Sequence, residues 1–129
     1  MARILLVDDE ATVRRIMQVG LSKAGHDVST ADNGHTALEQ VRLGQPDVLI
    51  TDIEMPRMNG RKLCEALETE LPGRRFPIFV LTSLTEHEHR RWSSAMRNLH
   101  FMEKPVSLRT LLAQIDACLA PQPPAARVS

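Results

Sequence analysis

Four groups of polar side chains in this chain carry residue types that suit metal or phosphoryl chemistry, and each directly follows a short apolar run. Carboxylates hold hard cations and can act as nucleophiles, while an ammonium group and a hydroxyl group can bind anionic oxygens. The groups are Asp8-Asp9 after residues 4–7, Asp52 at the end of 47–52, Thr82 at the end of 77–82, and Lys104 after 99–102. If the apolar runs are parallel strands, these side chains meet in space.

The carboxylates among these residues predict a metal site. Open parallel sheets bind ligands outside the carboxyl ends of their strands, so Asp8, Asp9 and Asp52 are expected at one edge of the sheet. There they repel one another, and a bound cation relieves the repulsion. Oxygen ligands with open coordination positions suit Mg²⁺, or Mn²⁺ in its place. The adjacency of Asp8 and Asp9 favours metal holding, with one ligating directly and the other through water.

Asp52 is the best candidate for a nucleophile toward a phosphoryl group, because it is the single carboxylate at the end of the central strand. The resulting acyl phosphate needs partners for its three oxygens, and the cation, the Lys104 ammonium and the Thr82 hydroxyl supply them. Each residue alone has a simpler interpretation. Asp8-Asp9 would be a strand end or a helix cap, Asp52 a turn cap, and Lys104 a surface side chain. Their joint occurrence favours the site.

The segments that must position these residues alternate between apolar runs and helical periodicity, which is typical of βα units over a parallel sheet. We expect the polar tract over 86–98 to form a short, weakly anchored helix, and the strand at 26–31 to lie at the sheet edge because of its mixed polarity. The predicted strands are 2–7, 26–31, 47–52, 77–82 and 99–102; the predicted helices are about 10–24, from Asn33-Gly34 to near Gly44, 60–70, 86–98, and from the N-cap Ser107 to 119.

The length of 129 residues predicts one folded unit. We expect a domain over 1–120 and a flexible Pro/Ala-rich tail or linker stub over 121–129, because the prolines there cannot continue a helix. Whatever this chain controls is then expected in another chain or in a segment beyond this sequence.

Composition and charge exclude several classes of protein. No apolar run approaches the roughly 18 residues of a spanning helix, so we expect no membrane contact and a cytoplasmic location. A formal net charge of zero lacks the basic surface that direct nucleic-acid binding requires. Cys64 and Cys118 are expected to be reduced thiols, and the absence of clustered Cys and His argues against a zinc site.

The four motifs, in order and separation, resemble the receiver domain of response regulators in two-component signalling, and in particular the stand-alone chemotaxis receivers. The resemblance covers residues from about 2 to 120 and implies a flavodoxin-like, doubly wound five-stranded parallel sheet of order 2-1-3-4-5 flanked by five helices. The residues that carry it are Leu6-Val7-Asp8-Asp9-Glu10, residues 47–60, Val80-Leu81-Thr82-Ser83 and Phe101-Met102-Glu103-Lys104-Pro105.

The resemblance implies a role for each position of the site. Asp52 would accept a phosphoryl group from a phosphohistidine on a sensor histidine kinase or a histidine phosphotransfer protein. The implied metal ligands are the side chains of Asp9 and Asp52 and the backbone carbonyl of Glu54, with Asp8 acting through water. Lys104 would pair with the phosphoryl oxygens, and the Lys104-Pro105 bond is expected to be cis.

The resemblance also implies a switch. Thr82 would turn toward the phosphoryl group, and Phe101 would fill the vacated space, changing a surface made by the fourth helix, the fifth strand and the fifth helix. Phe101 stands where Tyr is common, so no ring hydroxyl takes part. Glu54 and Leu84 occupy positions that tune the phosphoryl lifetime in the family.

Several functions remain open from the sequence. The chain is expected to be a switch that signals to a downstream protein partner and catalyses at most its own phosphorylation and dephosphorylation. The alternatives are a phosphorelay intermediate, the receiver fragment of a longer regulator, an aspartyl-phosphate hydrolase using Glu54 as acid or base, and a degenerate scaffold. The intact Asp9, Asp52, Thr82 and Lys104 argue against the scaffold. The hydrolase lacks a cap segment to close over a substrate.

Overall fold

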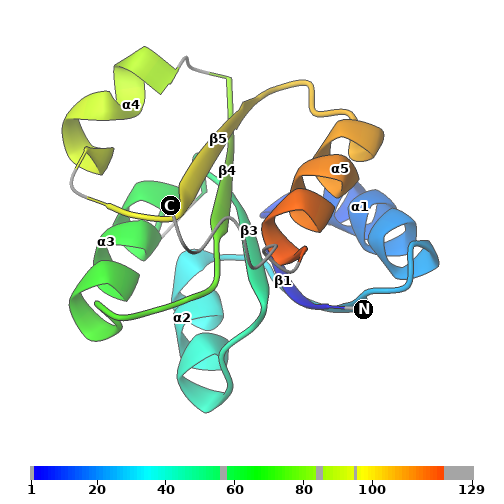
Figure 1. Cartoon of the computed structure of the whole chain (residues 1–129), viewed down its shortest axis with the longest axis horizontal. Helices are drawn as coiled ribbons and strands as arrows, with labels where there is room; N and C mark the ends of the chain where they lie inside the picture. The colour runs from blue at the N-terminus through cyan, green and yellow to red at the C-terminus, as the bar shows by residue number, and fades with distance from the viewer. Residues whose placement is uncertain (1, 56–57, 84–85, 95, 121–129) are drawn as a thin grey trace, which may run out of the picture.

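The computed structural model describes residues 2–55, 58–83, 86–94 and 96–120, without the side chains of residues 86 and 87. Strands and helices alternate along these residues (Figure 1). The strands are β1 (Arg3–Val7), β2 (Asp27–Ala31), β3 (Val48–Asp52), β4 (Ile78–Thr82) and β5 (Leu99–Glu103). The helices are α1 (Ala11–Lys23), α2 (Gly34–Leu43), α3 (Gly60–Glu70), α4 (Glu86–Ser93) and α5 (Leu108–Leu119).

The five strands form one parallel sheet in the order β2-β1-β3-β4-β5, which confirms the predicted fold class and strand order. The weakly apolar β2 lies at an edge, as predicted. β3 is central, so Asp52 at its end lies between β1, which leads to Asp8, and β4, which ends at Thr82. The predicted convergence of the strand ends follows from this order.

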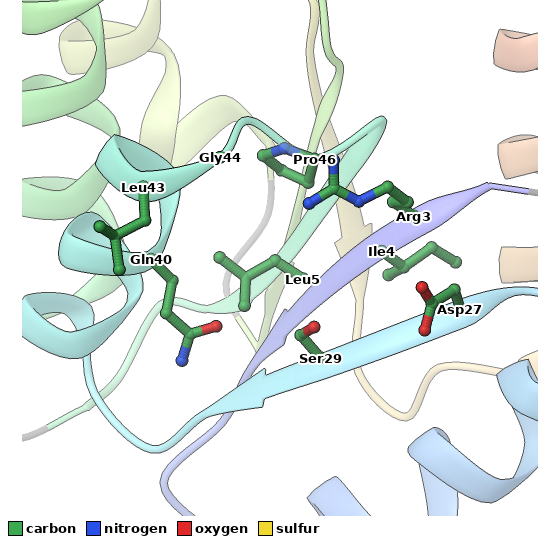
Figure 2. A pocket seen from close by; sticks show the side chains of 9 residues that line it. All are labelled: Arg3, Ile4, Leu5, Asp27, Ser29, Gln40, Leu43, Gly44 and Pro46. Atoms are coloured by element: carbon green, nitrogen blue, oxygen red, sulfur yellow. The ribbon is translucent and has the colours of Figure 1, made fainter.

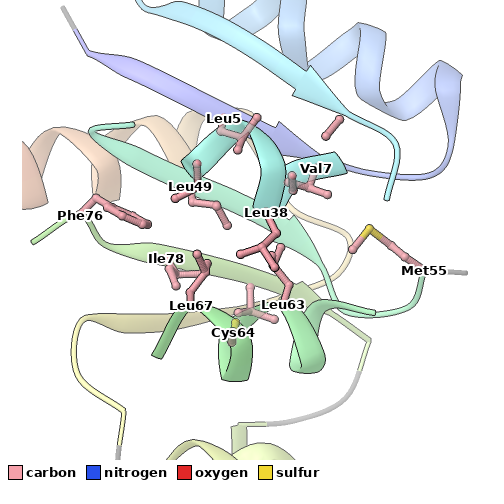
Figure 3. Close-up of a cluster of buried hydrophobic side chains, with 14 of the residues drawn as sticks. Leu5, Val7, Leu38, Leu49, Met55, Leu63, Cys64, Leu67, Phe76 and Ile78 are labelled. Atoms are coloured by element: carbon pink, nitrogen blue, oxygen red, sulfur yellow. The ribbon is translucent and has the colours of Figure 1, made fainter. Parts of the chain in front are cut away.

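Successive strand residues point to opposite faces, and each face carries its own apolar cluster. Helices α2, α3 and α4 lie on one face, and α1 and α5 lie on the other (Figure 1). Because helices cover both faces, the strands are apolar at successive positions rather than at alternate ones. The first cluster includes Leu5, Leu38, Leu49, Leu63 and Ile78 (Figure 3), and the second includes Ile4, Leu21, Ile50, Phe79 and Leu111.

The main difference from the prediction is the fourth helix, which ends at Ser93 rather than near Asn98. Asn98 has a φ of 58°, in the left-handed region that a right-handed helix does not contain. Its side-chain amide donates to the Arg75 carbonyl, and its own carbonyl accepts from the Ile78 N–H. The chain is therefore already paired with the start of β4 where the prediction still placed helix.

The bounds of the other elements agree with the prediction to within one residue at each end, as expected for frayed ends. Three features of the sequence analysis lie outside the described residues. These are the tail over 121–129, Leu84, and the two central residues of the motif over 47–60, Pro56 and Arg57.

Candidate functional site

Three carboxylates meet at the carboxyl ends of β1 and β3. One carboxylate oxygen from each of Asp8, Asp9 and Asp52 lies within 4.8 Å of the others. Asp8 and Asp52 are buried, at 2% and 3% exposed, while Asp9 faces the solvent. The structure therefore brings together the three acidic side chains that the sequence predicts at this edge.

Lys104 reaches this cluster from the end of β5. Its Nζ lies 2.8 Å from Asp52 Oδ1, although the Lys104 side chain is 37% exposed. The backbone N–H of Glu54 donates to the same oxygen at 3.4 Å. Asp52 is thus a buried carboxylate, one oxygen of which is held by both a cation and a peptide N–H.

The backbone fixes Lys104 beside β4. The Lys104 N–H donates to the Thr82 carbonyl at 2.7 Å, so the two predicted site residues adjoin through the main chain. The Lys104-Pro105 peptide is cis, as predicted. The hydrogen bond to Thr82 and the contact between Nζ and Asp52 hold the Lys104 side chain at the end of the sheet where Asp52 lies.

The turn after Asp52 is closed by Gly60, the first residue of α3. Its N–H donates to the Ile53 carbonyl at 2.9 Å, and Asn59 caps the helix by accepting from the Lys62 N–H. A Cβ atom on Gly60 would lie 2.4 Å from the Asp52 carbonyl oxygen. The glycine of the predicted motif is therefore required by the close approach of α3 to the backbone of Asp52.

Burial and charge shape the electrostatics of the site. The pKa of Asp8 is raised first by burial and then by the charges of Asp52 and Asp9, although the Glu10 N–H and Lys104 act in the opposite direction. For Lys104, burial alone would lower the pKa. The hydrogen bond and charge of Asp52, together with the charges of Asp8 and Glu10, raise it above its ordinary value.

These residues fit a hard divalent cation. Three oxygen donors converge, and the raised pKa of Asp8 shows that the fold holds its carboxylate at a cost that a cation would offset. The Glu54 N–H bond to Asp52 brings the Glu54 backbone to the site, which agrees with a role for its carbonyl as a further oxygen donor. Among the described residues, this is the one cluster of at least three acidic, His or Cys side chains with such an arrangement.

Thr82 is buried at the end of β4, and its hydroxyl has a partner that sequence reasoning missed. Thr82 Oγ1 lies 2.9 Å from Nε2 of His89, a residue of α4 that is 4% exposed. The sequence analysis gave His89 no role at the site. The signal available was its spacing of three residues from Trp92, which places both side chains on one helix face.

Phe101 lies half-buried on β5, beside this histidine. Its ring stacks on the His89 ring, with centroids 4.9 Å apart and an interplanar angle of 4°. Trp92 is half-buried against the cluster beneath α2 and α3. The predicted switch residues Thr82 and Phe101 therefore both contact His89.

A cavity of about 540 Å³ opens beside the carboxylates, between α1 and the turn after Lys104. Its charged lining residues are Asp8, Glu10 and Lys104, and the other residues that line it are apolar. Its apolar lining includes Val13, Ile16, Met17, Pro105 and Val106. Ile16 is 65% exposed, so an apolar surface lies next to the charged site.

A second hollow, of about 250 Å³, lies at the amino ends of β1 and β2 (Figure 2). Arg3 and Asp27 flank it, and Leu43 from the end of α2 lies on its rim. No predicted site residue lines this hollow, so it takes no part in the candidate site.

A family model described as the response regulator receiver domain matches residues 4–116. The chain therefore belongs to the response regulator receiver family. Members of this family act as switches in two-component signalling. They take phosphoryl groups from histidine kinases or phosphotransfer proteins and bind Mg²⁺ at an acidic pocket.

Within the described residues, no helix has both the length and the apolar character to cross a bilayer.

Individual relatives differ in length. Protein PilH of Pseudomonas aeruginosa is 34% identical over 120 residues, which cover 93% of this chain and 99% of PilH. The response regulator MprA of Mycobacterium leprae is 38% identical over 117 residues, which cover 91% of this chain and 50% of MprA. The chain thus spans nearly all of PilH but half the length of MprA.

Solved structures agree with this assignment. The chemotaxis protein CheY4 of Vibrio cholerae superposes with a TM-score of 0.83 at 32% identity, covering 92% of this chain and 99% of CheY4. TrrA of Thermotoga maritima, solved in complex with Mg²⁺ and BeF, has a TM-score of 0.79 at 28% identity, covering 92% of this chain and 100% of TrrA.

Proposed function

We propose that this chain is a phosphorylation-activated switch that accepts a phosphoryl group on Asp52 in a Mg²⁺-dependent reaction, with Mn²⁺ able to replace Mg²⁺. The observation that carries the proposal is the buried Asp52 carboxylate, which adjoins two further carboxylates and lies 2.8 Å from Lys104 Nζ. The donor is a phosphohistidine on a sensor histidine kinase or on a histidine phosphotransfer protein.

In the transfer, a carboxylate oxygen of Asp52 bonds to phosphorus as the bond from phosphorus to the donor nitrogen breaks. The departing imidazole takes a proton from the solvent. Lys104 binds phosphoryl oxygens through its ammonium group, and Thr82 binds them through its hydroxyl. A bound Mg²⁺ supplies positive charge that offsets the repulsion between the carboxylates and the incoming group.

The ion would be held by the side chains of Asp9 and Asp52 and by the Glu54 carbonyl, with Asp8 acting through water. Asp8 also accepts a hydrogen bond from the Glu10 N–H at 2.9 Å, which fixes its carboxylate at the end of β1. This donor set leaves open positions for water and phosphoryl oxygens, which Mg²⁺ sites commonly retain.

The apolar cavity beside Asp8 and Lys104 supports a protein as the donor. Exposed apolar side chains of α1, such as Val13 and Ile16, adjoin charged groups of the site, and a histidine carried on an amphipathic helix could meet both kinds of surface. The expected output surface is that of α4, β5 and α5, which responds through Thr82 and Phe101 and acts on a downstream protein partner. The chain then catalyses at most its own phosphorylation and dephosphorylation.

The alternative functions are those of the receiver portion of a longer response regulator and of a phosphorelay intermediate. The match to half of MprA favours the longer regulator, whereas the match to 99% of PilH favours the stand-alone switch. We expect the folded receiver to extend over residues 1–120 in either case.

Intact-mass measurement after incubation with Mg²⁺ and acetyl phosphate, or with a phosphorylated histidine kinase, tests the proposal. We expect one phosphoryl group on the wild type and none on Asp52→Asn. Asp27→Asn, which changes an aspartate at the amino end of β2, is the matched control and should be labelled normally. A wild type that takes no label refutes the proposal. Label on Asp52→Asn would move the acceptor elsewhere, and continuous turnover of acetyl phosphate would favour a hydrolase.

A further inference from the structure

The imidazole of His89 has a partner on each ring nitrogen. Nε2 lies 2.9 Å from Thr82 Oγ1, and Nδ1 accepts a hydrogen bond from the Trp92 indole N–H at 3.1 Å. His89 is 4% exposed, so these bonds are shielded from water. The phosphoryl chemistry proposed above does not use this histidine.

The contacts determine the tautomer of the ring. An indole N–H can only donate, so Nδ1 of His89 is unprotonated and Nε2 carries the proton. Nε2–H therefore donates to Thr82 Oγ1. Burial lowers the pKa of His89, and the nearby Glu88 opposes this only in part, so the pKa agrees with a neutral ring.

Three aromatic rings pack as one unit around this bond. The His89 ring stacks on Phe101, and Trp92 meets both rings edge-on, at centroid distances of 5.7 Å from His89 and 5.8 Å from Phe101. The Arg61 guanidinium of α3 lies over the Trp92 ring, 5.9 Å from its centroid. Because both rings pack against His89, a displacement of His89 also moves Trp92 on α4 and Phe101 on β5.

We propose that His89 is a positioning residue whose Nε2–H holds the Thr82 hydroxyl, and that this bond breaks when Thr82 turns to a phosphoryl group on Asp52. The inference rests on the proposed function, because it requires that phosphoryl group. Rotation of the Thr82 side chain carries Oγ1 away from His89 and leaves a buried N–H without its acceptor, which is unfavourable. The His89 ring then shifts, and the packed Trp92 and Phe101 shift with it.

The chain contains its own reporter of this movement. Trp92 is the single tryptophan, and there is no tyrosine, so the intrinsic emission comes from the indole that donates to His89. We expect phosphorylation of the wild type with Mg²⁺ and acetyl phosphate to change the emission of Trp92 in proportion to the mass gain.

Two variants of His89 distinguish the effect of its hydrogen bonds on the response from the effect of its ring packing. His89→Phe keeps a ring for stacking but removes both nitrogens, and His89→Gln keeps an amide N–H near the position of Nε2. His89→Phe should take label on Asp52, because His89 does not touch that carboxylate. Its initial rate should rise about 2- to 5-fold because the bond between His89 and Thr82 no longer has to break, and its emission change should be at most about a third of the wild-type change. His89→Gln should recover part of the wild-type response.

His100→Gln is the matched control. His100 stacks on Phe79 at 4.9 Å and lies near Cys118, so it belongs to no part of the His89 unit. This variant should keep both the labelling rate and the emission change of the wild type.

A measurement on the wild type covers the case in which His89→Phe does not fold. Nitrogen NMR of the ring should show the Nε2–H tautomer before labelling and a shift of the Nε2 signal after it. An Nδ1–H tautomer, an unchanged Nε2 signal, or a full emission change in His89→Phe would each overturn the inference. Label on the wild type with no change at Trp92 would overturn the inference alone, whereas no label would refute the proposed function as well.

Discussion

Lys104 Nζ lies 2.8 Å from Asp52 Oδ1, so the proposed phosphoryl acceptor is paired with a cation before any donor arrives. Lys104 directly follows β5 and Asp52 is the last residue of β3, and β4 lies between these two strands in the sheet. The raised pKa of Lys104 keeps the ammonium charged through neutral pH. The positive charge that a phosphoryl group would meet is therefore preorganised rather than recruited.

Lys104→Met should slow the phosphorylation of Asp52 by acetyl phosphate on the order of tenfold or more. The substitution frees the Asp52 carboxylate from its partner, but it also removes the charge that offsets repulsion between three carboxylates and an anionic donor. The second effect dominates because the donor adds further negative charge. Lys62→Met, an exposed lysine of α3, is the control and should keep the wild-type rate in the same mass assay. Equal rates for the two variants would contradict the assigned role of Lys104.

Asp8→Asn should stabilise the domain at pH 7 in the absence of Mg²⁺. The pKa of Asp8 is raised above 3.8 in the folded chain, first by burial and then by Asp52 and Asp9. The folded state therefore binds more protons than the unfolded state once the pH passes 3.8, and stability falls as the pH rises through the interval up to the folded pKa. Asparagine does not ionise, so the variant avoids this loss of stability. Its side-chain oxygen can still accept the hydrogen bond from the Glu10 N–H.

Urea unfolding at about pH 7 and about pH 3, with and without Mg²⁺, measures the effect. The advantage of Asp8→Asn should disappear near pH 3, where both states of the wild type are protonated at this residue. Added Mg²⁺ should stabilise the wild type more than the variant, because binding to the folded state alone raises its stability. The control Asp27→Asn should differ from the wild type by less than about 0.5 kcal/mol under each condition. A variant less stable than the wild type at pH 7 without Mg²⁺ would refute the assignment.

Much of the site was predictable because strand order converts sequence position into proximity. Asp8, Asp9 and Asp52 follow apolar runs, and the carboxyl ends of adjacent parallel strands meet at one edge. The same rule placed Lys104 near Asp52, although its contact at 2.8 Å also depends on the bond between the Lys104 N–H and the Thr82 carbonyl. Apolar periodicity thus located the strand ends, and the resemblance to receiver domains supplied the order in which the strands lie.

The part involving His89 was not predictable in the same way. The segment of α4 is polar, with Trp92 as its one large apolar side chain, so its pattern does not show which face is buried. The contacts of His89 depend on how α4 packs against Phe101 and the end of β4. This packing joins parts of the chain that are distant in sequence, so a local pattern does not reveal it. For the same reason the end of α4 at Ser93 was missed, because the left-handed Asn98 and its bond to Arg75 are tertiary features.

Gly60→Ala should destabilise the domain by about 2–4 kcal/mol and slow the labelling of Asp52. The added Cβ would lie 2.4 Å from the Asp52 carbonyl oxygen and 2.8 Å from Ile53 Cα, and both are backbone atoms that cannot turn aside. Gly73→Ala is the matched control, because a Cβ there has no neighbouring atom within 4 Å. Urea unfolding should give the control a stability within about 0.5 kcal/mol of the wild type. A fully stable Gly60→Ala would show that α3 can move away from Asp52.

The two cysteines should differ sharply in their reaction with iodoacetamide at about pH 8. Cys64 is 1% exposed beneath α3, and burial raises the pKa of its thiol to about 12, with Arg74 opposing the rise only in part. Cys118 is exposed on α5, and burial of its sulfur raises its pKa less. Since the thiolate is the nucleophile, a pKa of about 12 rather than 9.0 lowers the reactive fraction of Cys64 roughly 1000-fold, in addition to steric protection.

Mass spectrometry should therefore find one modification on the folded wild type, none on folded Cys118→Ser, and one on Cys118→Ser in urea. Rapid labelling of folded Cys118→Ser would mean that the cluster between α3 and the sheet opens far more often than its packing implies.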